Sequence, residues 1–335
     1  MSLVTGLICR RVFDTHKLMT EFPPRFSHRN KQVAFRVACP SGSTYSGQIV
    51  FSRWGMMSLP GTLDGDGSRT TFEAREDYFG YESQPERDSV VEWYLNFAHE
   101  DLFCAYGGPL FAQDEMQVTE HPALGALREA LLQSDIEPLT VADGEPTPAL
   151  IMGVERRCRV AIDRNPALGR PDGLYGNNFS WASADAIQKA TQAILPPTIT
   201  NVLAMEAPAC GEGRYSRDEI AHILCTVFTG FTAARLESNR DKPQPPGVVV
   251  HTGFWGCGAY GGNRILMALL QLLGARLARL SRLVFHTGDA AGTQAYLQAS
   301  RIMQAVESSA RSQTLSGIVA QIEAIGWHWG VSDGN

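Results

Sequence analysis

A glycine-rich turn between a buried strand and a leucine-rich helix constrains the fold of this chain more than any other feature. Val248-Val249-Val250 is a continuous β-branched run, which is typical of a strand buried on both faces. The turn Gly253–Gly262 follows, and Ile265–Leu280 then carries leucines along one helical stripe. Leu283-Val284-Phe285 predicts the next short strand. This β–loop–α–β order favours a sheet that contains parallel strands.

The rest of the chain predicts further elements of both kinds. Strands are expected at Gln48–Arg53, Val90–Ala98 and Val160–Ile162, and helices at Ala123–Leu132, Ser183–Ile194, Asp218–Arg235 and within Gln294–Ile325. Asp241–Gly247 is expected to be a stiff surface connection, and the C-terminal tail to be unstructured. The chain is therefore predicted to be a mixed α/β protein.

Composition and charge argue against several classes of protein. The formal net charge of −6 argues against a nucleic-acid-binding surface as the main function. Every apolar run is shorter than the roughly 18–20 residues that a membrane helix needs, and Arg10 and Arg11 follow the first apolar run instead of preceding it, unlike a secretory signal. Seven cysteines stand singly, which favours reduced thiols and a cytoplasmic location. We expect neither a nucleic-acid nor a membrane partner.

The turn itself contains a GxGxxG pattern, Gly256-Cys257-Gly258-Ala259-Tyr260-Gly261. Glycines let the backbone approach a diphosphate closely, and a following helix N-terminus favours an anion. One alternative is a tight turn whose glycines serve packing alone. A nicotinamide-cofactor domain is a second alternative, but it calls for an acid about 20 residues later, and Arg276–Arg282 contains none. A dehydrogenase is therefore disfavoured.

The wider stretch His251–Ala275 closely resembles the late glycine-rich segment of the poly(ADP-ribose) glycohydrolases, a macrodomain-type family. Tyr260 replaces a phenylalanine of that pattern, Phe254 an asparagine and Asn263 an aspartate. The resemblance implies a loop around the diphosphate of ADP-ribose, with Tyr260 against the ribose and Phe285 beside the adenine. It places Phe254, Gly256, Cys257, Gly258, Ala259 and Tyr260 in the binding site, with Cys257 packing and not acting as a nucleophile.

A second stretch resembles the signature of the same family. The family has a strand ending in Asp-Phe-Ala-Asn, a run of glycines and then Gln-Glu-Glu. This chain has Asn96-Phe97-Ala98-His99, Gly107-Gly108 and Gln113-Asp114-Glu115 in the same order. The resemblance implies that Asn96, His99, Gly107, Gly108 and Gln113 belong to the ADP-ribose site. It also implies that Glu82, in Gly80-Tyr81-Glu82, reads the adenine amino group.

The acidic pair in this stretch suggests glycosidic chemistry. Breaking the ribose C1″–O bond passes through an oxocarbenium-like state, and a carboxylic acid must protonate the departing oxygen. By resemblance, Glu115 is this acid and later the base for water, while Asp114 holds the ribose hydroxyls. The alternative is an ordinary acidic first helical turn. No metal or cofactor is expected, since the sequence has no HxH or HExxH pattern, and the lack of GxSxG leaves a serine hydrolase without support.

Departures from the family pattern limit the expected substrate. The glycine run has two members, the spacer Pro109–Ala112 is short, and Asp114 and His99 replace a glutamate and an asparagine. Asp143–Gly153 lacks the tyrosine that the family places over the site. We therefore expect an ADP-ribosyl glycohydrolase, a glycosidase-type hydrolase of O-linked ADP-ribose, that frees mono-ADP-ribose or short chains from protein side chains. The alternative function is a non-catalytic ADP-ribose reader.

The expected architecture is a single macrodomain-like unit over residues 1–335, a mixed β-sheet flanked by helices. Residues 1–45 would form an accessory N-terminal segment, residues 45–290 the core, and residues 290–335 a helical tail. The partners would be ADP-ribose and an ADP-ribosylated protein. Residues 1–40 and the insertion Asn165–Ser183, with Tyr175 and Trp181, carry no motif, and our hypothesis is that they form a substrate-specific rim.

Overall fold

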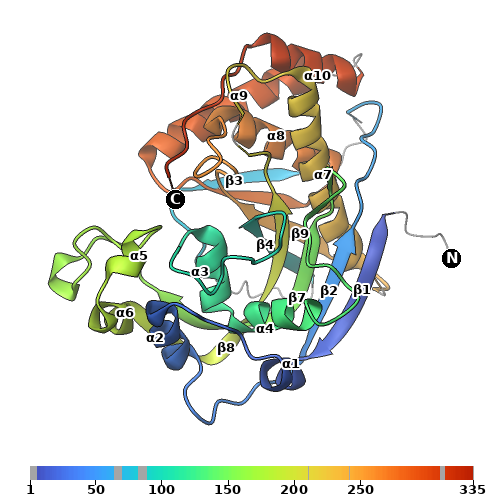
Figure 1. Ribbon diagram of the computed structural model, residues 1–335. Helices are drawn as coiled ribbons and strands as arrows, with labels where there is room; N and C mark the ends of the chain where they lie inside the picture. The colour runs from blue at the N-terminus through green and yellow to red at the C-terminus, as the bar shows by residue number, and fades with distance from the viewer. Residues whose placement is uncertain are drawn as a thin grey trace.

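One eight-stranded mixed sheet runs through the protein, as a computed structural model shows (Figure 1). The structure describes residues 6–63, 70–81, 89–209, 211–240, 242–309 and 314–334. In spatial order the strands are β1 (Leu7–Asp14), β2 (Gln48–Trp54), β7 (Ala149–Val160), β8 (Thr191–Glu206), β4 (Val90–Ala98), β9 (Gly247–Thr252), β10 (Arg282–His286) and β3 (Thr71–Arg75). Strands β8, β4, β9, β10 and β3 are parallel neighbours, whereas β1, β2, β7 and β8 pair antiparallel.

Helices cover both faces of this sheet (Figure 1). One face carries α7 (Arg217–Asn239), α8 (Arg264–Leu277), α9 (Ala290–Ser309) and α10 (Leu315–Ala324). The other carries α1 (Thr15–Glu21), α2 (Arg29–Ala38), α3 (Gln113–Glu120), α4 (Pro122–Leu131) and α6 (Ala184–Ala190). Along β8, Leu203 packs on the first face and Val202 on the second, as the two-residue period of a strand requires. The predicted mixed α/β class is confirmed.

The glycine-rich unit folds as predicted into β9, loop, α8 and β10. Helix α8 begins after Asn263, whose side chain accepts hydrogen bonds from the backbone N–H groups of Ile265 and Leu266 and caps the helix. The strand at Gln48–Arg53 is confirmed as β2 and that at Val90–Ala98 as β4. The helices predicted at Ala123–Leu132 and Asp218–Arg235 are confirmed as α4 and α7, and the single late helix is in fact two, α9 and α10.

Two local predictions are wrong. Helix α6 ends at Ala190, and β8 begins at Thr191, inside the predicted helix Ser183–Ile194. Pairing with β7 decides this, since Cys158 lies opposite Ala193 and Arg156 opposite Thr198, with a register shift that leaves Pro196 and Pro197 unpaired. The strand predicted at Val160–Ile162 ends at Val160 and begins eleven residues earlier, at Ala149.

The charged centre of β7 explains why this strand was not recognised. Arg156 is bonded to Glu120 at 2.8 Å and Arg157 to Glu155 at 2.8 Å, and all four side chains are buried. Charged side chains can be buried when they pair with opposite charges. A buried strand such as β7 therefore does not need a continuous run of apolar residues. The pattern of hydrophobic residues therefore fails as a signal for this strand.

Both terminal segments are integrated into the fold. The expected accessory segment supplies the edge strand β1, which pairs with β2, and buries Asn30 and Lys31 of α2. The C-terminal tail has no regular structure, as predicted, but it packs: the Gly330 N–H donates to Gly261 O at 2.7 Å, and Trp329 stacks on Tyr215. The tail thus lies against the glycine-rich loop.

None of the helices within the described ranges combines the length and apolar character needed to cross a membrane.

We predict that Leu269→Ala lowers the free energy of unfolding by roughly 2–5 kcal/mol, because Leu269 is fully buried between α8 and the sheet and its removal leaves a cavity. Urea unfolding measures this change. Leu132→Ala is the matched control, since Leu132 is 53% exposed at the end of α4. A loss below about 1 kcal/mol at Leu269 would contradict the packing described.

Candidate active site

The candidate site lies where parallel strands end. The chain leaves β4 at Ala98, β8 at Glu206, β9 at Thr252 and β10 at His286, and such carboxyl ends are where open α/β sheets bind ligands. Two connected cavities open there. We call the first, of about 270 Å³, the carboxylate cavity; its walls include His99, Gln113, Asp114, Glu115, Tyr175, Gly256, Gly258, Ala259 and Tyr260.

The first residues of α3 are held rigidly against β4. The Gln113 side chain accepts a hydrogen bond from the Phe97 N–H at 2.8 Å and donates one to Leu95 O at 2.9 Å. Its amide is therefore used to dock α3 on the end of β4, in addition to lining the cavity. This docking fixes the position of the two acids that follow.

Asp114 and Glu115 are both buried beside the cavity. Asp114 Oδ1 accepts a hydrogen bond from Asn96 Nδ2 at 2.9 Å, and Glu115 Oε2 accepts one from the Ala112 N–H at 3.0 Å. Asn96 itself is fully buried and lines neither cavity. The side chain of Asn96 thus faces Asp114 and holds it in place, and its contact with the ligand stays a prediction.

Burial, followed by the neighbouring Glu115 carboxylate, raises the pKa of Asp114 to about 7. The hydrogen bond from Asn96 and the positive charge of Lys31 act in the opposite direction. Asp114 can therefore keep its proton close to neutral pH in this buried setting.

A buried lysine faces this pair from the N-terminal segment. Lys31 is fully buried, its ammonium donates to Tyr106 O at 2.8 Å, and it lies over the rings of Phe111 and Phe179. Burial lowers the pKa of Lys31 to about 8, while the charges of Glu115 and Asp114 act to raise it. A cation in this position partly offsets the negative charge of the acids.

The glycine pair before α3 faces the N-terminal segment instead of the cavity. The carbonyl oxygen of Gly107 accepts from the Ser27 and His28 N–H groups at 3.0 and 2.9 Å, and a Cβ on Gly107 would collide with the Arg25 carbonyl oxygen. Neither Gly107 nor Gly108 lines a cavity at the site. Gly107 thus contacts the residues before α2, and the ligand contact of the two glycines stays a prediction.

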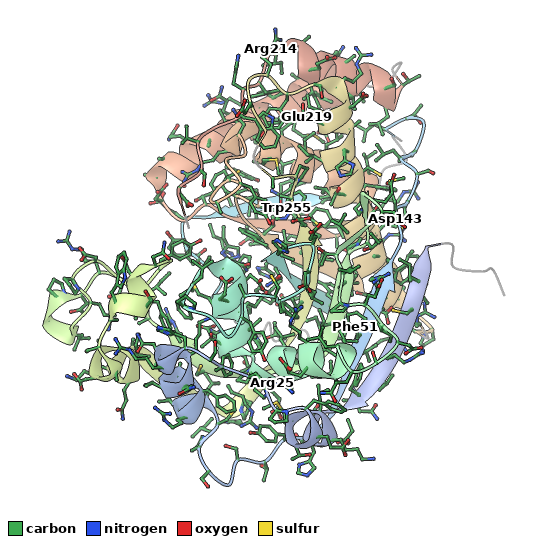
Figure 2. All side chains as sticks on the ribbon, viewed as in Figure 1. Arg25, Phe51, Asp143, Arg214, Glu219 and Trp255 are labelled. Carbon is green, nitrogen blue, oxygen red and sulfur yellow. The ribbon has the colours of Figure 1, made fainter. Side chains whose placement is uncertain are left out.

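The glycine-rich loop forms the opposite wall of the carboxylate cavity. Gly256 has φ +74°, and a Cβ there would lie 2.5 Å from that of Ala207. Trp255, in the interior in Figure 2, donates from its indole N–H to Met205 O at 3.0 Å and anchors the loop on β8. The backbone of Gly258 and Ala259 faces the cavity as predicted.

Two aromatic residues of this loop line the site. Tyr260 lies at one end of the carboxylate cavity, with its hydroxyl 3.0 Å from Glu206 Oε1. Phe254 lies at the other end and is covered by the Arg264 guanidinium at 5.2 Å. Burial raises the pKa of Cys257 to about 12, so its thiol stays protonated at neutral pH and is unsuited to nucleophilic attack.

The second cavity, of about 830 Å³, we call the aromatic cavity. Its walls include Tyr78, Phe79, Tyr175, Phe254, Arg264, His286 and Asp333. Phe285 is fully buried beneath it, 5.0 Å from the ring of Phe254. The side chain of Phe285 points into the core, whereas the next residue, His286, faces the cavity, and a contact of Phe285 with the adenine stays a prediction. Glu82 lies outside the described residues.

Three polar side chains, Asp77, His286 and His251, contact one another at the wall of the aromatic cavity. His286 Nδ1 lies 2.6 Å from Asp77 Oδ1, and its Nε2 lies 3.0 Å from His251 Nδ1. Burial lowers the pKa of both histidines. The cavity wall therefore contains a neutral imidazole beside a carboxylate, which suits hydrogen bonding more than charge pairing.

Sequence reasoning gave no binding role to three residues at the site. Tyr175 comes from the insertion that was expected to form a rim, and it lines both cavities, whereas Trp181 is 76% exposed and lines neither. Arg264 is the one lysine or arginine that lines the aromatic cavity among the described residues. Lys31 is the third of these residues. The only signal in the sequence for any of them was an exception to the local pattern, such as a lysine between apolar helical positions.

Comparison with known families supports the resemblance drawn from the motifs. Residues 170–294, which include the glycine-rich loop, match the family model described as poly(ADP-ribose) glycohydrolase, macro domain fold. Over residues 170–294 the chain is therefore similar to this family. The matched range covers α6, β8, α7, β9, α8 and β10, and stops short of the acidic pair. No curated protein sequence matches the chain significantly.

Solved structures similar to this chain include two bacterial poly(ADP-ribose) glycohydrolases. The poly(ADP-ribose) glycohydrolase of Thermomonospora curvata bound to the inhibitor ADP-HPD aligns with a TM-score of 0.48 and 16% identity, over 82% of this chain and 98% of that one. The enzyme of Deinococcus radiodurans in complex with ADP-ribose aligns with a TM-score of 0.42 and 16% identity, over 89% and 94%.

The raised pKa of Asp114 predicts how stability depends on pH. Between its ordinary value of 3.8 and about 7, the folded chain retains a proton that the unfolded chain has lost. The stabilising contribution is therefore complete at low pH and is lost as pH rises through about 7. We predict that Asp114→Asn reduces the fall in unfolding free energy between about pH 5 and 8, measured with urea.

Asp218→Asn is the matched control for this experiment, because Asp218 is an exposed aspartate in the first turn of α7. It should leave the pH dependence of the wild type unchanged. The same fall in wild type and Asp114→Asn would show that the buried carboxyl does not carry the proton.

Proposed function

We propose that this protein is an ADP-ribosyl glycohydrolase that releases ADP-ribose from modified protein side chains. The observation that supports this most is the order of the two cavities. They share Phe97, Gln113, Tyr175, Phe254 and Gly258, so they form one continuous channel past the glycine-rich loop. Acids stand at one end of the channel, and aromatic rings with one arginine stand at the other.

This order matches the chemistry of ADP-ribose. The adenine would lie among Tyr78, Phe79 and Phe254 in the aromatic cavity, where flat apolar faces favour stacking. The diphosphate would pass the backbone of Gly256 and Gly258, near Arg264. The terminal ribose would then lie between Tyr260 and the acidic pair.

The acidic pair supplies the proton transfers for hydrolysis. The Glu115 carboxyl gives its proton to the acceptor oxygen as the C1″–O bond breaks, while Asp114 binds a ribose hydroxyl. The resulting Glu115 carboxylate takes a proton from water as the water oxygen bonds to C1″. ADP-ribose and the free side chain leave, and Glu115 is protonated again.

The proposed substrate is mono-ADP-ribose or a short chain on an oxygen of a protein side chain. The two-member glycine run and the short spacer Pro109–Ala112, both departures from the family pattern, support this choice over a long polymer. The cysteines at described positions are all unpaired, which supports a reducing, cytoplasmic setting.

We predict that Glu115→Gln abolishes release of ADP-ribose and retains ADP-ribose binding, because the amide keeps the size of the side chain but cannot give a proton. The loss should be at least about 10²-fold in kcat. Release is measured on poly(ADP-ribose) and on proteins mono-modified on serine, threonine, arginine, glutamate or aspartate, and binding by calorimetry.

Three outcomes of this experiment are informative. Release that collapses in Glu115→Gln supports the glycohydrolase and names the linkage. Tight binding without release from any substrate would favour the reader, for which the altered acidic motif is the specific observation. Absence of ADP-ribose binding would overturn both functions.

We also predict that Arg264→Ala weakens ADP-ribose binding about ten-fold or more, because a hydrogen bond between a guanidinium and a phosphate is worth roughly 1.5–3 kcal/mol. Calorimetry measures the change in Kd. Arg301→Ala, on the exposed side of α9, is the matched control. Equal affinity in wild type and Arg264→Ala would place the diphosphate elsewhere.

A further inference from the structure

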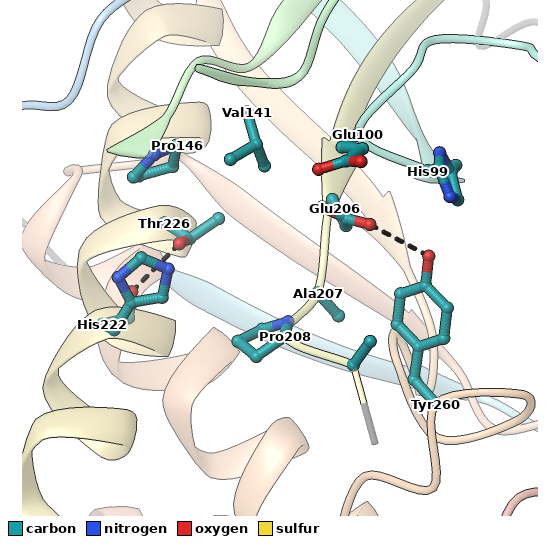
Figure 3. Close-up of a pocket in the computed structure, with 11 residues that line it drawn as sticks. His99, Glu100, Val141, Pro146, Glu206, Ala207, Pro208, His222, Thr226 and Tyr260 are labelled. Atoms are coloured by element: carbon teal, nitrogen blue, oxygen red, sulfur yellow. Dashed lines mark hydrogen bonds between the residues drawn. The ribbon is translucent and has the colours of Figure 1, made fainter. Parts of the chain in front are cut away.

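A third cavity continues from the carboxylate cavity on the side away from the adenine end. This acidic side pocket, of about 400 Å³, lies between the hairpin β5 (Val141–Ala142) and β6 (Glu145–Pro146), helix α7, and the ends of β4 and β8 (Figure 3). Its walls are His99, Glu100, Val141, Pro146, Glu206, Ala207, Pro208, Ala209, His222, Thr226 and Tyr260.

The three cavities follow one another in a line. The acidic side pocket shares His99, Ala207 and Tyr260 with the carboxylate cavity and none of its wall residues with the aromatic cavity. The ribose bond to be broken points away from the diphosphate and the adenine. The side pocket is therefore reached from the end of the carboxylate cavity at which the leaving group departs.

The walls of the pocket combine an apolar lining with two carboxylates. Val141, Pro146 and Pro208 surround the cavity, and the carboxylates of Glu100 and Glu206 stand near each other at one end (Figure 3). Glu206 Oε1 accepts the Tyr260 hydroxyl at 3.0 Å, so this acid is tied to the residue that separates the two cavities. Among the described residues, no lysine or arginine lines the pocket.

A nearby acid, Asp101, shows that a carboxylate in this region can pair with a basic side chain. Asp101, next to Glu100, is bonded to both guanidinium nitrogens of Arg128, at 2.6 and 3.0 Å. Glu100 and Glu206 face a cavity instead. A long basic side chain fits such a cavity, because its aliphatic stem contacts apolar walls while its charged end reaches carboxylates.

We propose that the acidic side pocket binds a lysine or arginine side chain of the ADP-ribosylated protein, close in sequence to the modified residue. This proposal rests on the proposed function of the neighbouring site. The pocket would select modified segments that are rich in basic residues, and Tyr260 would link this selection to the position of the ribose.

The test uses two ADP-ribosylated peptides that differ in one respect. Both carry ADP-ribose on serine; one has lysines and arginines beside the serine, and the other has glutamines in their place. Binding is measured by calorimetry in the full-length Glu115→Gln protein, which prevents turnover. We expect the basic peptide to bind about three- to ten-fold more tightly, as partly exposed charge pairs allow.

Variants of the pocket decide whether it causes this preference. Glu100→Gln and Glu206→Gln should each reduce the ratio of the two Kd values, and together they should bring it close to one. The side-chain amide oxygen introduced by Glu206→Gln can still accept the Tyr260 hydroxyl, so binding of the glutamine peptide is expected to persist. Glu145→Gln, at the exposed tip of the hairpin and outside the pocket walls, removes the same charge and should leave the ratio unchanged.

The outcomes separate the two proposals. Equal binding of both peptides by the protein, or a preference that survives in the Glu100→Gln, Glu206→Gln double variant, would overturn the side-pocket proposal alone. A preference lost equally in Glu145→Gln would also overturn it, since it would reflect overall charge. Failure to bind either peptide would overturn the proposed function together with the pocket.

Discussion

Two adjacent carboxyl groups, Asp114 and Glu115, are buried at the start of a helix, and much of the structure serves to make this possible. Buried acids are costly unless hydrogen bonds or opposite charges compensate them. Asn96 holds Asp114, the first backbone N–H groups of α3 favour negative charge there, and Lys31 supplies a buried cation. The compensation is partial, and the pKa of Asp114 stays raised, to about 7.

This requirement explains the role of the first 40 residues. Lys31 reaches the acids because α2 packs against the sheet, and the Ser27 and His28 N–H groups fix the loop at Gly107. In turn, β1 extends the sheet on which these helices rest. The N-terminal segment thus supports the candidate active site through the charge of Lys31 and the hydrogen bonds to Gly107.

The lining of the channel changes from one end to the other, because each part of it follows the end of a different parallel strand. Aromatic residues follow β3 and β9, the glycine-rich loop lies in the middle, and residues after β4 and at the end of β8 contribute to the acidic side pocket. The portions of the channel therefore differ in chemistry. Under the proposed function, discrimination between acceptors would change at Glu100 and Glu206 without changes to Asp114 and Glu115.

Sequence alone determined the features that depend on neighbouring residues: the β9–loop–α8–β10 unit, strands β2 and β4, and the presence of Gln113, Asp114, Glu115, Gly258 and Tyr260 at one site. Their spacing carries the information, because helix and strand periods and glycine turns are local properties. Tertiary structure decided the rest. Strands β7 and β8 form because distant segments pair. Tyr175 and Arg264 reach the cavities from segments without a motif, and Lys31 places its charge near the acidic pair from another. Asn96, Gly107 and Phe285 contact other parts of the protein for the same reason, since the direction of a side chain depends on what packs around it.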